Sequence, residues 1–264
     1  MPTLTLGDFE LYYEVDGEGL ETVLLIGGVA DDIDTWSLQL PALHQAGYRT
    51  IRVDNRGVGR SSAPEGHFTT QTLARDLSAL LAHLKLGPVH VVGISMGGMI
   101  AQELALLPGS DVCSLTLACT YAAPGRYVRR TQEQMIDLTG RAGAAFALQF
   151  VMTLAFTPAF FAERDAEAQE YDSAALALAP SPDVFVRQLE ASMSHDTSDR
   201  LQDIRIPTLV IAAREDVLIP RELSTRLADG IPSAILRVVP GGHCCLWEQP
   251  APFNAAIVEF LGSQ

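Results

Sequence analysis

Short apolar runs alternate with longer helical patterns along most of the chain. Uninterrupted apolar runs predict buried strands at 22–26, 89–94, 112–118 and 208–213. Between them, apolar residues recur three and four positions apart, as in the leucine stripe over 73–84, which predicts helices. Strands that alternate with helices in this way predict an α/β fold with a mostly parallel sheet covered by helices on both faces.

Both ends of the chain extend this pattern. The segment 9–15 alternates large apolar and polar residues, which is typical of a half-exposed strand, and no helix separates it from the strand at 22–26. These two N-terminal strands suit an antiparallel start to the sheet. A helix is expected after Asp34 or Thr35 as N-cap, ending at Gly47. Near the C-terminus we expect a helix at 220–228, a last strand in "AILRVV" and a closing helix after Pro250.

One stretch breaks the alternation. Residues 122–200 show helical patterns without a convincing strand, and they are rich in Ala, Leu, Phe and Met. A structureless loop of that length inside a compact domain would be exceptional. We therefore predict a core domain made of residues 1–121 and 201–264, into which a helical cap, residues 122–200, is inserted. The cap would cover the edge at which the parallel strands end.

A serine stands at the sharpest corner of the chain. "GISMG", residues 93–97, is a G-x-S-x-G motif with Ser95 at its centre, directly after a predicted strand and before a predicted helix. In that context the motif is a nucleophile elbow, which projects the serine hydroxyl above the sheet. A serine that merely caps the helix would be the simpler interpretation. Whether a base and an acid accompany the serine decides between the two.

A base and an acid follow in the expected order. The chain has six histidines: His44, His67, His83, His90, His195 and His243. Only His243 lies in a loop directly after a late strand, while His195 ends the helical insertion and is the second choice. Asp216 follows the strand at 208–213, with its neighbour Glu215 as the alternative acid. The order Ser95, Asp216, His243 predicts a catalytic triad of nucleophile, acid and base.

These motifs together resemble the α/β-hydrolase family over nearly the whole chain. "DNRGVGRSS" is similar to the family's D-x-R-G-x-G-x-S loop, and "GGHCCLWEQPAPF" is similar to its G-H-x-x-x-x-E-x-P-x-x-F ending. Within the family, "GISMGGMIAQELAL" and "WSLQLPAL" look most like 3-oxoadipate enol-lactonases and related small carboxylesterases. The resemblance implies the α/β-hydrolase fold with a helical cap.

The loop after the predicted strand at 22–26 departs from the family's pattern. It reads Gly27-Gly28-Val29-Ala30 where the family usually has His-Gly, and in this it resembles aclacinomycin methylesterase-type enzymes. The resemblance assigns the oxyanion hole to the backbone N–H groups of Val29 and Met96. A missing histidine side chain does not remove main-chain donors of this kind.

The substrate pocket is harder to read from the sequence. We take Gly28, Trp36, Phe150 and Met152 as its candidates, although packing at a helix start explains Trp36 better than substrate contact does. Apolar cap residues would favour an apolar acyl or ring group. The acidic pair at 31–32 is expected to be solvated, with a place at the pocket mouth as the alternative.

Composition and charge narrow the partners. The formal net charge is −14 and no basic run occurs, which argues against nucleic acid. No segment is apolar enough to span a membrane and the N-terminus lacks a signal-like pattern, so a cytoplasmic protein is expected. The four cysteines, at 113, 119, 244 and 245, are expected to be free thiols, since none shows metal-ligand spacing. We expect no metal and no cofactor, a small ester or lactone as partner, and leave a homo-oligomer open.

The reaction expected from these residues is hydrolysis of a carboxylic ester or lactone through an acyl-enzyme. The same triad also serves carbon–carbon bond hydrolysis, perhydrolysis, acyl transfer and the tailoring of polyketide-type esters, and the fold alone does not separate these. A ligand binder without catalysis is the alternative from a different functional class.

Overall fold

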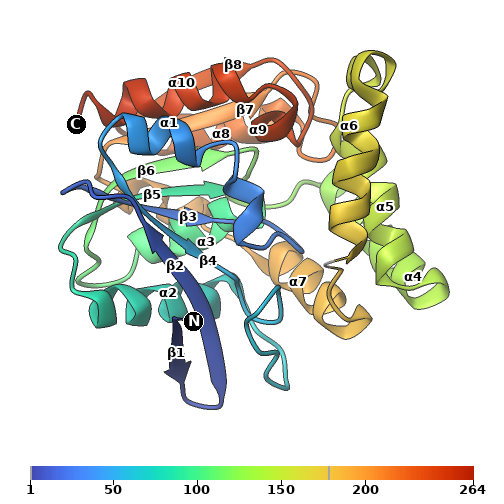
Figure 1. Ribbon diagram of the computed structural model, residues 1–264, viewed down its shortest axis with the longest axis horizontal. Coiled ribbons are helices and arrows are strands. Elements are labelled where there is room, and N and C mark those ends of the chain that lie inside the picture. Colours follow the sequence, from blue (N-terminus) through green and yellow to red (C-terminus); the bar gives the residue numbers. More distant parts are fainter. Residues whose placement is uncertain (1, 178) are drawn as a thin grey trace.

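A single twisted sheet organises the molecule. The computed structural model describes residues 2–177 and 179–264, and its eight-stranded sheet has the order β1-β2-β4-β3-β5-β6-β7-β8. The strands are β1 (Thr3–Leu6), β2 (Phe9–Asp16), β3 (Thr22–Ile26), β4 (Arg49–Val53), β5 (Val89–Ile94), β6 (Val112–Ala118), β7 (Thr208–Ala213) and β8 (Ala234–Val239). From β4 to β8 all neighbours are parallel, and β2 is antiparallel to both β1 and β4. The predicted α/β fold with a mostly parallel sheet is confirmed (Figure 1).

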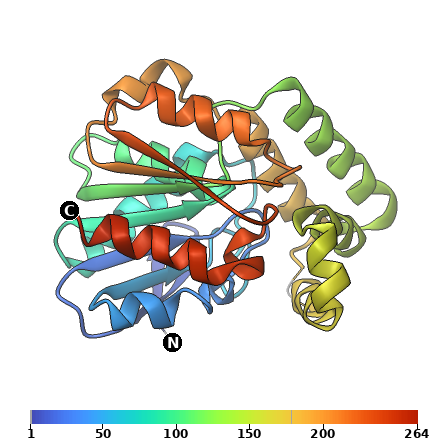
Figure 2. The same cartoon turned by 90° about the horizontal axis from the view of Figure 1, so that it is seen from above.

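Helices cover both faces of this sheet. The helices that pack on it are α1 (Leu40–Gln45), α2 (Thr70–Leu84), α3 (Met96–Ala105), α8 (Arg221–Gly230), α9 (Cys245–Glu248) and α10 (Pro250–Leu261). One face carries α1, α9 and α10, and the other carries α2, α3 and α8 (Figures 1 and 2). Among the described residues, no helix combines the length and apolar character needed to cross a membrane.

The central strands show why the chain reads as uninterrupted apolar runs. All six residues of β5 are buried. Val91 packs with the helices on one face and Val92 with those on the other, since successive side chains of a strand point to opposite sides. A strand covered twice therefore shows no polar alternation, and β5 is held rigidly where it delivers the chain to residue 95.

The structure differs from the sequence expectations at the N-terminal end. A short strand, β1, had no clear signal in the sequence. The antiparallel partners of β2 are β1 and β4, and β3 lies between β4 and β5. The expected helix after Asp34 is split into a 3-10 turn, Ile33–Trp36, capped by Asp32, and the helix α1. Pro41 explains the break, because it has no backbone N–H to donate to a carbonyl of the preceding turn and therefore fits only in the first turn of a helix, as it does in α1.

Four helices lie between β6 and β7. They are α4 (Arg126–Ala142), α5 (Ala144–Ala155), α6 (Pro158–Ala177) and α7 (Pro182–Ser194), called here the α4–α7 segment. They lie beyond the edge at which the parallel strands end (Figures 1 and 2), and α7 also packs against the core, where Ser192 Oγ lies 3.5 Å from Met99 Sδ of α3. The helix α6 kinks at Arg164, whose backbone is not helical. The loops that directly follow strands β3, β5, β7 and β8 therefore face this segment.

Candidate active site

Ser95 occupies a strained corner between β5 and α3. Its backbone has φ 54° and ψ −122°, a region that side chains rarely adopt. Its N–H donates to the carbonyl of Ala118 on the neighbouring strand at 2.9 Å, and its own carbonyl accepts the Thr120 hydroxyl at 2.7 Å. These two bonds fix the corner from the side of β6.

The glycines around Ser95 are required by contact with backbone. A Cβ built on Gly93 would lie 2.3 Å from the Gly97 carbonyl oxygen, and one on Gly97 would lie 2.1 Å from the carbonyl oxygen of Ile26. Both separations are far below any van der Waals contact, so only glycine fits. The turn can be this tight because both of its shoulders lack side chains, which is why the G-x-S-x-G spacing was informative.

Asp216 and His243 form a hydrogen-bonded pair beside this corner. His243 Nδ1 lies 2.8 Å from Asp216 Oδ2. The other carboxylate oxygen of Asp216 accepts the backbone N–H groups of Leu218 at 2.9 Å and Ile219 at 2.8 Å. Asp216 follows β7 and His243 follows β8, and the carboxyl group is almost completely buried. This arrangement leaves Nε2 of the imidazole as the nitrogen free to serve as a base.

The surroundings of His243 shift its proton affinity. Burial by itself would lower its pKa, but the charge of Asp216 and the hydrogen bond to it raise the pKa above its usual value, with a further contribution from Asp31. The carboxylates therefore favour the imidazolium, which is the form that arises when the ring takes a proton from a hydroxyl group.

Two other carboxylates hold the loop that carries His243. Glu215, the alternative acid in the sequence analysis, accepts the N–H of Gly241 at 2.8 Å and so points away from the imidazole. Glu248 accepts the N–H of Gly242 at 3.1 Å and also binds the backbone N–H and the hydroxyl of Thr157. Neither carboxylate bonds His243, so Asp216 is the acid that the geometry supports.

The loop after β3 presents backbone donors next to Ser95. Among the described residues, no protein acceptor takes the N–H of Val29 or of Met96. Three bonds hold the loop: the Gly28 N–H donates to Asp31 Oδ2 at 2.7 Å, the Ala30 N–H donates to Gln188 Oε1 at 2.9 Å, and Asn55 Nδ2 donates to the Gly27 carbonyl at 3.3 Å. Gln188 belongs to α7, so the α4–α7 segment helps to shape a loop of the core. No pattern in the sequence indicates this contact.

A cavity of about 120 Å³ lies between the sheet edge and the α4–α7 segment. Its lining combines the core residues Val29, Asp31, Ile94, Ser95, Leu218, Ile219, His243, Cys244, Leu246 and Trp247 with the segment residues Val128, Thr131, Gln132, Met135, Leu148, Val151, Met152, Ala155, Phe185 and Leu189. Most of these side chains are apolar. Ser95 and His243 thus line one small, largely apolar cavity. Ligand sites are generally concave and mostly apolar.

Of the residues expected in the pocket, the structure places two elsewhere. Trp36 is 1% exposed and packs in the core under α1, so helix-start packing explains it. Phe150 is 45% exposed on the outer side of α5, whereas Val151 and Met152 line the cavity. The 100° step between helical residues carries Phe150 to the other face. A Cβ on Gly28 would lie 3.0 Å from the Ser95 Cβ, so Gly28 adjoins Ser95 but has no side chain to line the pocket.

For Asp31 the structure favours the alternative kept in the sequence analysis, a place at the pocket, over the expected solvated position. Its carboxyl group lines the cavity beside His243. Burial raises the pKa of Asp31 to about 6, although the bond from the Gly28 N–H acts in the opposite direction. The sequence pattern offered one clue, because Asp31 follows the glycine pair at the end of β3, where the chain turns over the sheet edge.

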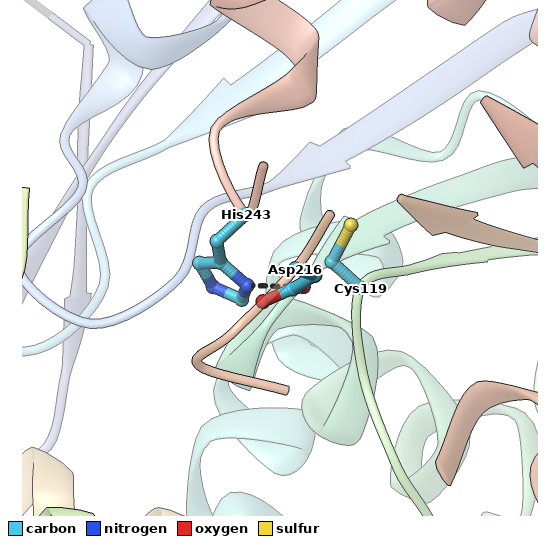
Figure 3. A group of neighbouring side chains, drawn as sticks. All are labelled: Cys119, Asp216 and His243. Atoms are coloured by element: carbon cyan, nitrogen blue, oxygen red, sulfur yellow. Dashed lines mark hydrogen bonds and ion pairs between the residues drawn. The ribbon is translucent and has the colours of Figure 1, made fainter. Parts of the chain in front are cut away.

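One further group near the site has donor atoms close enough for a metal. The ligand atoms of Cys119, Asp216 and His243 lie within 4.8 Å of one another (Figure 3). Asp216 and His243 already bond each other, however, and Cys119 Sγ faces Cys245 Sγ at 3.6 Å. Contact with Cys245 and burial raise the pKa of the Cys119 thiol well above its usual value, which opposes the thiolate that a metal requires. Nothing in this arrangement calls for a bound ion.

His195, the second choice as base, lies outside the cavity lining. It is buried and its Nδ1 lies 3.0 Å from the hydroxyl of Thr70 on α2. Burial lowers its pKa to about 4, with Glu103 acting in the opposite direction. A neutral, structural imidazole fits this position at the junction of α7 with the core.

Comparisons with known proteins add evidence on the family of this chain. The profile of the alpha/beta hydrolase fold matches residues 21–250. A curated relative from Azorhizobium caulinodans, named "Putative carbamate hydrolase RutD", is 34% identical over 99% of this chain and 98% of its own length.

Solved structures agree in fold. A thermophilic esterase from Thermogutta terrifontis superposes with a TM-score of 0.88 at 28% identity, covering 100% of this chain and 99% of the other. The enol-lactonase of Burkholderia xenovorans LB400 superposes with a TM-score of 0.89 at 24% identity, covering 99% and 100%. At that lower identity the likeness is one of fold alone.

Proposed function

This chain belongs to the alpha/beta hydrolase fold family and is a hydrolase, and from that premise we propose that it cleaves carboxylic esters or lactones with a Ser-His-Asp triad. The observation that carries the proposal is the Asp216–His243 hydrogen bond of 2.8 Å, placed in the same cavity as a serine on a strained elbow. A serine hydroxyl needs such a base to become a nucleophile at neutral pH.

In the proposed reaction each of these groups acts once while the acyl-enzyme forms and once while it is hydrolysed. Ser95 Oγ attacks the carbonyl carbon while His243 Nε2 takes the hydroxyl proton, and Asp216 stabilises the imidazolium that forms. The developing oxyanion receives hydrogen bonds from the N–H groups of Val29 and Met96, which donate to no other described residue. The imidazolium then gives its proton to the leaving alcohol, and water cleaves the acyl-enzyme by the same steps in reverse order.

A neutral carbamate is the second candidate substrate, because the curated relative named above carries that designation. The carbonyl carbon of a carbamate is open to the same attack, and the leaving group departs with the same proton. The triad geometry does not distinguish the two bonds. The comparison of a carbamate with the ester of the same alcohol therefore belongs in the first substrate panel.

The acyl-enzyme is the intermediate on which the proposal rests. A fluorophosphonate probe should label wild-type protein at Ser95, and peptide mass analysis should place the adduct on that residue. The Ser95→Ala variant is the matched control and should remain unlabelled. A wild-type protein that hydrolyses esters but carries the label elsewhere, or on no residue, would contradict the assignment.

A further inference from the structure

The cavity beside Ser95 has an unusual charge balance. Among the described residues that line it, none is Lys or Arg, and the only carboxylate is that of Asp31. A substrate with a carboxylate on its acyl group would find no cation to pair with. It would have to place its charge in a mainly apolar chamber, which is costly for an unpaired ion.

Asp31 is close to the point at which bonds change. A Cβ added to Gly28 would lie 3.0 Å from both Asp31 Oδ2 and Ser95 Cβ, so the carboxylate and the nucleophile flank the same point. The carboxylate is held there by the Gly28 N–H at 2.7 Å. It does not pair with a cationic side chain, and it faces the same chamber as His243. Its charge is therefore felt by whatever occupies the cavity.

We propose that Asp31 determines specificity by charge: the site accepts esters of small uncharged acids and excludes acyl groups that carry a carboxylate. The inference rests on the ester hydrolysis proposed above and adds the substrate class. Two unit charges about 6 Å apart at an effective dielectric constant of about 20 repel strongly enough to change a rate about a hundredfold. A lactone derived from a dicarboxylic acid retains a free carboxylate and falls in the excluded class.

The volume of the chamber limits the size of the acyl group. The cavity of about 120 Å³ is lined mainly by apolar side chains. An apolar cavity of about 150 Å³ in another protein holds benzene, so an acyl chain of roughly six heavy atoms fills this one. The expected acid is thus short, apolar and uncharged.

Two methyl esters of equal shape test the proposal. Methyl 4-methylpentanoate and monomethyl succinate have matching chain length and branching, and only the second ends in a carboxylate. At pH 8, kcat/KM measured by methanol release should favour the neutral ester by about a hundredfold. The Asp31→Asn variant, whose amide oxygen can still accept the Gly28 N–H, should reduce this ratio to within about tenfold by turning over the succinate ester faster.

Asp32→Asn is the matched control. It removes the same charge one position along the chain, where the side chain caps the 3-10 turn at 2.9 Å and lies outside the cavity lining. Its ratio should equal that of the wild type. An equal wild-type preference for both esters, or a ratio left unchanged by Asp31→Asn, would overturn the proposal.

A pH series on the wild-type enzyme gives a second reading without any substitution. The groups around Asp31 are His243 and Cys244 across the cavity, Asp32 beside it and the Thr35 hydroxyl. Asp31 gains its proton as the pH falls through about 6, so the preference for the neutral ester should shrink there. Titration of His243 cancels in the ratio, because both esters use the same base.

The binding of the two esters separates this proposal from the hydrolytic one. Ser95→Ala protein should bind the neutral ester more tightly than monomethyl succinate in a calorimetric titration, and a further Asp31→Asn substitution should narrow that difference. If wild-type protein hydrolyses neither ester but this binding difference is present, the hydrolysis proposal fails and the charge selection stands. Equal binding of both esters overturns the charge selection whatever the rate of hydrolysis.

Discussion

The sheet edge and the α4–α7 segment build the same cavity by different physical means. At the sheet edge, glycines bring backbone to within 2.1 to 2.3 Å of where a Cβ would sit, and buried hydrogen bonds fix Asp216 and His243. On the segment side, the cavity wall consists mainly of apolar side chains such as Met135, Met152 and Phe185, which fill space without directional bonds. The sheet edge fixes the positions of Asp216 and His243, and the α4–α7 segment sets the volume of the cavity. We therefore expect the first region to control rate and the second to control which acyl groups fit.

The largest effect should come from the nucleophile. Ser95→Ala removes the attacking oxygen but keeps the elbow, so kcat/KM for any ester should fall by at least about a thousandfold. Thermal unfolding monitored by circular dichroism should change little, which distinguishes lost chemistry from lost structure. Ester hydrolysis by the variant at near wild-type rate would remove Ser95 from the mechanism.

The next effect tests the steric difference between the regions. Gly97→Ala forces a Cβ against the Ile26 carbonyl and should cost about 3 kcal/mol of unfolding free energy, because backbone on both sides resists movement. Gly140→Ala in α4 is the matched control: nothing lies within 4 Å of its Cβ, and alanine should stabilise that helix by up to about 1 kcal/mol. Denaturant unfolding measures both. Equal losses for the two variants would show that the regions are packed alike.

The pH dependence probes the sheet edge by its charges. His243 must be neutral to accept the serine proton, so kcat/KM should fall tenfold for each pH unit below its pKa. Because Asp216 raises that pKa, the limb should lie above the ordinary histidine value of about 6.5. Asp216→Asn should move the limb to lower pH and reduce the plateau rate. A limb that stays in place in Asp216→Asn would mean that another group sets it.

The smallest effects should separate the two faces of α5. Met152→Ala enlarges the cavity and should shift the preference from short to longer acyl chains by about tenfold, with a stability loss of about 2 kcal/mol. Phe150→Ala, two positions away but 45% exposed, should leave the preference within about twofold of wild type. A series of methyl esters from acetate to octanoate gives both answers. A selectivity change in Phe150→Ala larger than in Met152→Ala would place the binding surface outside the cavity.

The elements and residues that could be predicted from the sequence are those for which one local pattern determines the geometry. Both ends of strands β3 and β5 were predicted to the residue. A strand covered by helices on both faces is buried along its whole length, so the uninterrupted apolar run marks its bounds. Ser95, Asp216 and His243 could each be proposed since each stands just past a strand end, and parallel strands end at one edge. Strand β1 escaped notice because four half-exposed residues carry too little pattern.

Contacts between distant segments could not be read from the chain in the same way. The carboxamide of Gln188 reaches the Ala30 N–H across 158 positions, and no spacing rule connects them. Asp31 was expected to be solvated because adjacent acidic residues usually lie at the surface. Only the three-dimensional structure shows that its carboxyl group lines the cavity. Phe150 and Met152 looked alike in an apolar helix in which only Gln149 and Thr153 are polar, which left the side that faces the core ambiguous.

The ties around His243 bear on the engineering of chimaeras. The Cys244 N–H donates to the Ala155 carbonyl at 3.0 Å, and Glu248 bridges Gly242 to Thr157. A transplanted α4–α7 segment therefore meets its host at more than its two covalent ends: the turn from α5 to α6 bonds the loop that carries His243, and Gln188 of α7 bonds the loop after β3. A donor segment whose turn places the backbone carbonyl of this residue elsewhere would remove that support from the loop of His243, even if both covalent ends were joined correctly. Recombination libraries for this scaffold should inherit the turn between α5 and α6 together with the histidine loop, as one block.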